Sequence, residues 1–129
     1  MIKYTLIIAS FILFSMNNLL AADDPSIKGE VRTNANKAMV EHINKNSIDE
    51  NYVIYDPVSN KLRKLQFKEI HKGIVKKGDF YVSCADFVDG NENKFDLDFF
   101  VVEKDGKFHV QQAIVHKING EKRIYNIEK

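Results

Sequence analysis

Residues 80–118 constrain the fold of this chain more than any other stretch. They contain three runs of aromatic and β-branched residues, separated by the sequences DGNEN and KDGK. The Gly, Asp and Asn residues of these two breaks tolerate the backbone conformations that hairpin turns require. Runs of this composition between such turns predict neighbouring antiparallel strands. The stretch therefore predicts the centre of an antiparallel sheet.

The flanking sequence adds one helix and further strands. Apolar residues over 27–46 recur every three to four positions, which predicts an amphipathic helix with one apolar stripe. Shorter strand patterns cover 52–55 and 62–71, and Asn119-Gly120 predicts a tight hairpin into a last strand over 121–127. These elements predict an α+β fold, with the N-terminal helix packed on one face of a curled five- to six-stranded antiparallel sheet.

The N-terminus predicts export. A short basic start over 1–3, an apolar run over 4–14 and a more polar stretch ending in small residues form the three-part pattern of a secretory signal peptide. We expect a signal peptide over 1–21, with cleavage after Ala22 as the alternative, and a single domain over 22–129. The protein is then periplasmic or secreted. The apolar run is not expected to act as a membrane anchor, because roughly 20 apolar residues are needed to span a bilayer and Asn17 and Asn18 interrupt it. No stable membrane span is expected after cleavage.

Composition excludes some classes of partner and of covalent structure. The 129 residues, 44% of them hydrophobic, suffice for one modest core. A net charge of +1, from 19 basic and 18 acidic side chains, gives no field of one sign, so a nucleic-acid partner is not expected. The single cysteine, Cys84, cannot form an internal disulfide. Its position inside a strand pattern favours a buried small side chain.

Strand periodicity assigns side chains to the two faces of the predicted sheet, because successive residues of a strand point in opposite directions. A five-residue loop over 89–93 predicts the facing pairs Val88–Lys94, Asp86–Asp96, Cys84–Asp98 and Val82–Phe100. A three-residue loop over 104–106 extends this register to Phe100–Val110, Asp98–Gln112 and Asp96–Ile114. The Asn-Gly turn then sets His116 opposite Arg123.

One face of the predicted sheet collects polar side chains at one end, beside an apolar floor. The polar group comprises Cys84, Asp86, Asp96, Asp98, Gln112, His116 and Arg123. The other face suits contact with the helix and holds Tyr81, Ala85, Phe87, Phe95, Leu97, Phe99, Val101, Ala113 and Val115. A two-residue turn at Asp105-Gly106 would shift the following strand by one residue and send Gln112 and His116 to the helix face.

Converging polar groups beside an apolar floor are the general form of a ligand site. We therefore expect a binding or accessory protein without enzymatic activity, whose partner is a small molecule or an envelope protein. No resident cofactor is predicted. An unpaired terminal strand would also allow a homodimer.

Three alternatives remain open for the polar group. His116, Asp98 and Cys84, joined by His71, offer the imidazole, carboxylate and thiolate ligands of a zinc-like metal site, although no Cys-x-x-Cys or His-Glu-x-x-His spacing occurs. A structural network of salt bridges is the second alternative. A small cone-fold enzyme with Asp and His acid-base chemistry is the third, with Asp86 and Asp96 as its carboxylate pair.

The order of elements resembles the cystatin-like and nuclear-transport-factor-2-like (NTF2-like) rolls over 25–127. This likeness is architectural, and it implies a helix wrapped by a curled sheet. The Gln-x-Val-x-Gly hairpin of inhibitory cystatins has no counterpart, because the sequence QAIVH at 112–116 lacks the Gly, so protease inhibition is not implied. The phrases YDPV, HKG, YVSCADF, DLDF and VHK are similar to those of small exported bacterial proteins of unassigned activity, which implies an envelope location and no mechanism.

Overall fold

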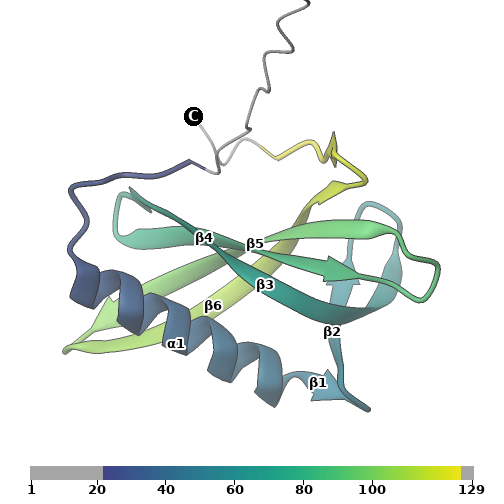
Figure 1. Ribbon diagram of the computed structural model, residues 1–129, viewed down its shortest axis with the longest axis horizontal. Coiled ribbons are helices and arrows are strands. Elements are labelled where there is room, and N and C mark those ends of the chain that lie inside the picture. Colours follow the sequence, from purple (N-terminus) through teal and green to yellow (C-terminus); the bar gives the residue numbers. More distant parts are fainter. Residues whose placement is uncertain (1–21, 126–129) are drawn as a thin grey trace, which may run out of the picture.

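The computed structural model describes residues 22–125, which form one helix and one antiparallel sheet. The elements are α1 (Gly29–Lys45), β1 (Ser47–Ile48), β2 (Asn51–Asp56), β3 (Lys61–Lys77), β4 (Phe80–Val88), β5 (Lys94–Lys104), β6 (Lys107–Ile118) and β7 (Glu121–Lys122). Each strand pairs with its neighbours in sequence, so the sheet has the order β1 to β7 (Figure 1). The predicted signal peptide over 1–21 lies outside the described residues. The predicted last strand over 121–127 is shorter than expected, because strand pairing ends at Lys122 and residues 123–125 are not in a strand; residues 126–127 lie outside the described residues.

The predicted α+β class is confirmed, and the arrangement is compatible with a roll-like architecture. The sheet has seven strands among the described residues, where five to six were predicted. The difference lies in the two-residue strand β1, which is too short for its side chains to alternate visibly in the sequence. No helix within residues 22–125 is both long and apolar enough to cross a membrane.

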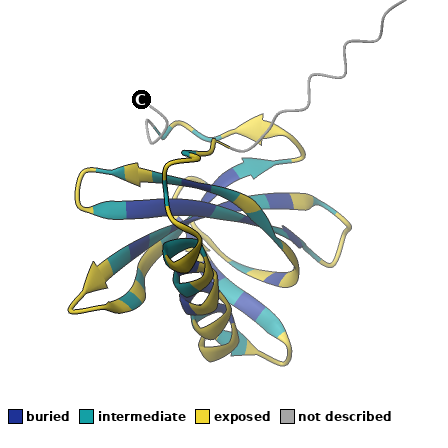
Figure 2. Cartoon of the chain, turned by 60° about the vertical axis from the view of Figure 1, so that its left-hand side comes forward, coloured by how far each residue is buried: buried dark blue, intermediate teal, exposed yellow. Residues whose placement is uncertain are grey.

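Helix α1 packs across one face of the sheet and buries its apolar stripe there (Figures 1 and 2). The stripe consists of Ala35, Ala38, Met39 and Ile43. The sheet residues predicted to face the helix do so: all of them belong to the core, with Ala113 packed against it as a partly buried member. The helix begins at Gly29 instead of residue 27, because residues 24–27 form a turn in which Ile27 N–H donates to the Asp24 carbonyl at 3.1 Å.

The register between β4 and β5 is the predicted one. Val88 pairs with Lys94, Asp86 with Asp96, Cys84 with Asp98 and Val82 with Phe100. Two acidic side chains therefore lie directly opposite each other on neighbouring strands, an arrangement that is unfavourable unless a proton or a cation reduces the repulsion.

The predicted register between β5 and β6 is wrong. The turn has two residues, Asp105 and Gly106, both at positive φ, and it pairs Lys104 with Lys107. The predicted pairs Phe100–Val110, Asp98–Gln112 and Asp96–Ile114 are therefore replaced by Phe100–Gln112, Asp98–Ile114 and Asp96–Lys117.

Two β-bulges in β6 keep His116 off the helix face despite the short turn. Val101 pairs with Val110 and Phe100 with Gln112, so Gln111 is an extra residue that restores the original alternation. A second shift, between the pairs Leu97–Val115 and Asp96–Lys117, leaves His116 as an extra residue. The Asn119-Gly120 hairpin is confirmed, with both residues at positive φ and Ile118 paired with Glu121.

Candidate functional site

A cavity of about 830 Å³ lies on the sheet face opposite α1. Its lining comes from the segment before α1, from β3 to β7, and from one helix residue: Ala22, Asp23, Arg32, Glu69, Ile70, His71, Lys72, Gly73, Val75, Lys77, Val82, Cys84, Asp96, Asp98, His116, Lys117 and Lys122. Cys84, Asp96 and Asp98 alternate along their strands with core residues such as Ala85 and Leu97, which explains why they reach this face.

A bulge within β3 brings His71 to the cavity. Ile70 pairs with Ala85 and Ile74 pairs with Ser83, so the three residues 71–73 lie opposite Cys84 alone. Such bulges redirect side chains that regular alternation would point elsewhere. His71 is therefore held beside Cys84, and its Nε2 lies 2.7 Å from Oδ1 of Asp86.

A further series of polar contacts connects β4, β5 and β6. The thiol of Cys84 donates a hydrogen bond to Oδ1 of Asp98 at 2.9 Å, and Nδ1 of His116 lies 3.4 Å from the same oxygen. Asp98 and His116 are only 2% and 5% exposed, so this carboxylate and imidazole sit below the cavity surface. The two groups lie on one side of the sheet, as the strand pattern predicted.

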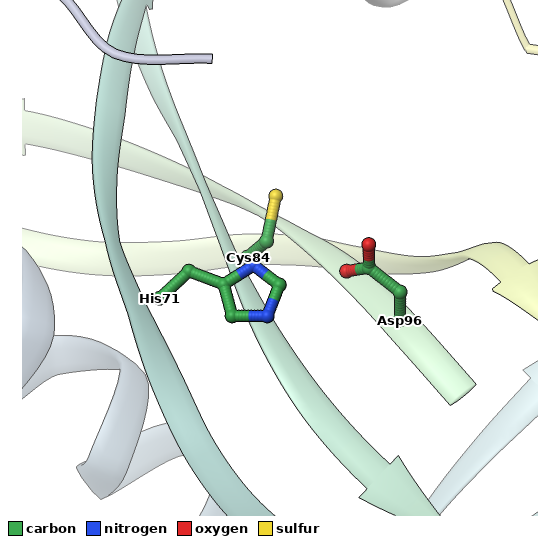
Figure 3. Close-up of side chains that lie close together, drawn as sticks. All are labelled: His71, Cys84 and Asp96. Atoms are coloured by element: carbon green, nitrogen blue, oxygen red, sulfur yellow. The ribbon is translucent and has the colours of Figure 1, made fainter. Parts of the chain in front are cut away.

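Asp96 belongs to two overlapping groups of potential metal ligands. The ligand atoms of His71, Cys84 and Asp96 lie within 4.8 Å of one another, and so do those of Asp96, Asp98 and His116. Figure 3 shows the imidazole of His71 beside the sulfur of Cys84, with the carboxylate of Asp96 facing them. In an occupied tetrahedral zinc site such atoms are about 3.3–3.8 Å apart, as follows from metal–ligand bonds of about 2.0–2.3 Å.

Two atoms of the first group are buried without a hydrogen-bond partner, namely Nδ1 of His71 and Oδ1 of Asp96. Buried polar atoms are satisfied in the great majority of cases, and an unsatisfied one calls for an explanation such as an ion or a ligand. Because Nε2 of His71 already contacts Asp86, Nδ1 is the nitrogen directed toward a further partner.

Burial raises the pKa of Asp96 above its usual value, and the neighbouring Asp98 raises it further. His71, His116 and Lys117 act in the opposite direction without cancelling the shift. A carboxyl group in this state takes up positive charge readily, either as a proton or as a cation.

The segment before α1 is fastened along the irregular part of β3. Asp24 N–H donates to the Ile74 carbonyl at 2.8 Å, and Ile74 N–H donates to Oδ1 of Asp23 at 3.0 Å. Arg32 holds the same place from α1, donating to Asp23 at 2.8 Å and to the Lys72 carbonyl at 3.2 Å. Ser83 adds a hydrogen bond from its hydroxyl to the Gly73 carbonyl at 2.9 Å. Hydrogen bonds other than the backbone hydrogen bonds between β3 and β4 thus hold the backbone on either side of the bulge that carries His71.

Replacing Asp23 with alanine is expected to loosen this part of β3 without unfolding the domain. The Ile74 amide would lose its acceptor and Arg32 its ion-pair partner, so amide hydrogen exchange at Ile74 should become faster while the global unfolding transition moves little. Glu41→Ala, which removes an exposed acid from α1, is the control. Unchanged exchange at Ile74 in the Asp23 variant would contradict the assigned role.

The structure brings most of the predicted polar group together. Cys84, Asp96, Asp98 and His116 line the cavity, and Asp86 is connected to it through His71. Gln112 and Arg123 lie apart. Gln112 is exposed on the same face outside the cavity, and Arg123 instead donates to Oδ2 of Asp56 at 2.9 Å.

Some features of the site were not predicted from the sequence. Asp96 was predicted as a member of the polar group but not as a metal ligand, although its position two residues before Asp98 puts both on one face. The contribution of Asp23 and Arg32 had no signal in the sequence, because their contacts depend on how the first residues lie along β3.

No protein-family model matches this chain, and comparisons with curated proteins and with solved structures gave no match either.

Proposed function

We propose that this protein is an exported, non-enzymatic binding protein whose ligand is a divalent transition metal ion of the zinc class. The ion is held by Nδ1 of His71, Sγ of Cys84 and a carboxylate oxygen of Asp96. Two observations carry the proposal: ligand atoms of these three residues lie within 4.8 Å of one another, and Nδ1 of His71 and Oδ1 of Asp96 are buried without hydrogen-bond partners. The likeness to cystatin-like and NTF2-like rolls belongs to the proposal and rests on element order alone.

The donor set suits zinc-class ions. Imidazole, thiolate and carboxylate are the ligands that Zn²⁺ takes in proteins, whereas Ca²⁺ and Mg²⁺ prefer oxygen ligands throughout. One thiolate and one carboxylate would balance the two positive charges of the ion, and neutral His71 would complete a three-ligand site.

Neighbouring residues supply the outer contacts that metal ligands usually have. Asp86 contacts Nε2 of His71, which fixes the ring with Nδ1 toward the ion. In the metal-free protein Asp98 accepts a hydrogen bond from the Cys84 thiol and so orients the sulfur, and the thiol gives up this proton when it binds the ion. Because Asp98 and His116 already contact each other at 3.4 Å, we assign them to this outer shell.

Metal titration tests the proposal. Protein freed of metal with a chelator should bind one equivalent of Zn²⁺, and Co²⁺ in its place should give a sulfur-to-cobalt charge-transfer absorption. Bound Zn²⁺ should also protect Cys84 from a thiol-specific reagent. The Gln112→Ala variant, altered on the same face outside the cavity, should behave like the wild type. Absence of stoichiometric binding, or binding with no protection of Cys84, would contradict the proposal.

A further inference from the structure

We infer that the cavity holds a small organic anion, whose carboxylate or phosphate group occupies the open coordination position of the metal ion. This inference rests on the proposed function, since the ion provides the anchor for the anionic group. It extends that function by assigning the chemical class of a second ligand.

The cavity is much larger than a metal ion needs. Its volume of about 830 Å³ lies within the range of roughly 300–1,000 Å³ typical of pockets for small organic molecules. His71, Cys84 and Asp96 together line only part of it. Three protein ligands also leave one position open on a four-coordinate ion, as in zinc sites that bind water or substrate. An exogenous group can therefore reach the ion from the cavity.

Part of the lining has no role in metal binding. Ile70, Val75 and Val82 contribute apolar surface to the cavity, and Val82 is only 6% exposed. Apolar side chains offer nothing to a hydrated ion, but they favour the carbon skeleton of an organic molecule. The lining thus combines a surface for an apolar group with one end that would carry the ion.

The charges around the cavity favour an anion once the ion is present. Five cationic side chains line it, namely Arg32, Lys72, Lys77, Lys117 and Lys122. Its acidic side chains are Asp23, Glu69, Asp96 and Asp98, of which Asp23 is paired with Arg32 at 2.8 Å. In the absence of metal, Asp96 and Asp98 repel an incoming anion. A divalent ion makes this end of the cavity less negative, even after the Cys84 thiol has lost its proton, so the repulsion is reduced. The open coordination position of the ion and the cationic side chains then attract the anion together.

This arrangement requires metal and anion to bind cooperatively. If the ion tightens anion binding by some factor, the anion must tighten metal binding by the same factor. A chain that bound the two ligands independently would lack this coupling. This reciprocity distinguishes binding at the metal ion from simple adsorption of anions to surface lysines, because adsorption would not depend on the metal.

The experiment measures binding of benzoate and phenyl phosphate to the exported protein, with and without Zn²⁺, by calorimetry. Benzyl alcohol serves as a neutral probe with the same ring. We expect at least one of the two anions to bind the zinc-loaded protein about fivefold or more tightly than the metal-free protein. Benzyl alcohol should show no such preference. The Co²⁺-loaded protein should change its visible absorption on adding the favoured anion, and comparison of the two anions distinguishes a carboxylate from a phosphate.

A charge variant and its control locate the anion in the cavity. Lys72→Gln should weaken anion binding while leaving Zn²⁺ stoichiometry unchanged, whereas Lys64→Gln, at an exposed position of β3 outside the cavity, should change neither. Zinc-loaded protein that binds neither anion, or binds both equally well without zinc, overturns this inference alone. A protein that takes up no zinc overturns the proposed function as well.

Discussion

Replacing Asp56 with alanine is expected to destabilise the domain by about 3 kcal/mol, the lower end of the range for removing one partner of a buried ion pair. The Asp56 carboxylate is completely buried and accepts hydrogen bonds from Arg63, Arg123 and Ser59 and from the Val58 backbone. Without it, two guanidinium groups whose side chains are 22% and 17% exposed would lose their shared partner. Thermal unfolding should shift down by roughly 12 °C or more.

The same carboxylate should make stability depend on acid. Burial alone would raise the pKa of Asp56, but the hydrogen bonds from Ser59 and Arg63 and the charge of Arg123 outweigh burial, so the pKa is lowered. A carboxyl group with a lowered pKa in the folded state stabilises the fold fully above its unfolded pKa of about 4. That contribution is lost as the pH falls through the folded-state pKa. The stability difference between wild type and Asp56→Ala should therefore shrink below about pH 4.

Denaturant unfolding at several pH values checks both expectations. Asp79→Ala, which removes an exposed acid from the turn after β3, is the control and should stay within about 0.5 kcal/mol of the wild type. If the Asp56 variant loses as little stability as the control, the expectation is wrong. Water would then replace the carboxylate as the hydrogen-bond partner of Arg63 and Arg123.

Replacing His71 with alanine, or Cys84 with serine, is expected to reduce zinc affinity more than about 100-fold. Loss of an outer-shell partner typically costs about 10–100-fold, and loss of a direct ligand should exceed this. Asp86→Asn should fall within that lower range, because it removes the charge that orients His71 without removing a ligand. The graded series separates direct ligands from supporting residues.

Matched variants distinguish a metal site from a structural salt-bridge network. His109→Ala changes an exposed histidine of β6 and should leave zinc affinity unaltered. The metal-free His71 and Cys84 variants should unfold close to the wild type, because neither side chain is part of the hydrophobic core. Variants that unfold readily, with unaltered zinc binding in the folded fraction, would assign the cluster to stability alone. The measurements are competition titrations with a zinc chelator and thermal unfolding of each variant.

The fold class and the β4–β5 pairing followed from the sequence because they depend on local features. Alternating apolar residues and the DGNEN loop determine which side chains of these strands face the core, and the observed pairs Cys84–Asp98 and Asp86–Asp96 agree. The gathering of Cys84, Asp96 and Asp98 on one face is a consequence of this alternation.

The placement of the histidines was decided by tertiary structure. His71 lies in a bulge of β3, and His116 is the extra residue of a bulge in β6. Bulges depend on how neighbouring strands pair, and they leave no mark in the amino-acid composition of the strand. Alternation alone could therefore not predict them. His116 reached the predicted face although the predicted turn beside β6 was wrong, because the shorter turn is offset by the extra residue Gln111.

Long-range pairing likewise decided the surroundings of the site. Arg123 was predicted to join the polar group, but its side chain pairs with Asp56, 67 positions earlier in the chain. Asp56 itself has the local sequence of an ordinary turn residue, and only the folded chain buries it between two arginines. Local alternation thus selects the face on which a side chain lies. Bulges and contacts between distant segments decide which of those side chains meet, since both depend on the whole sheet being assembled.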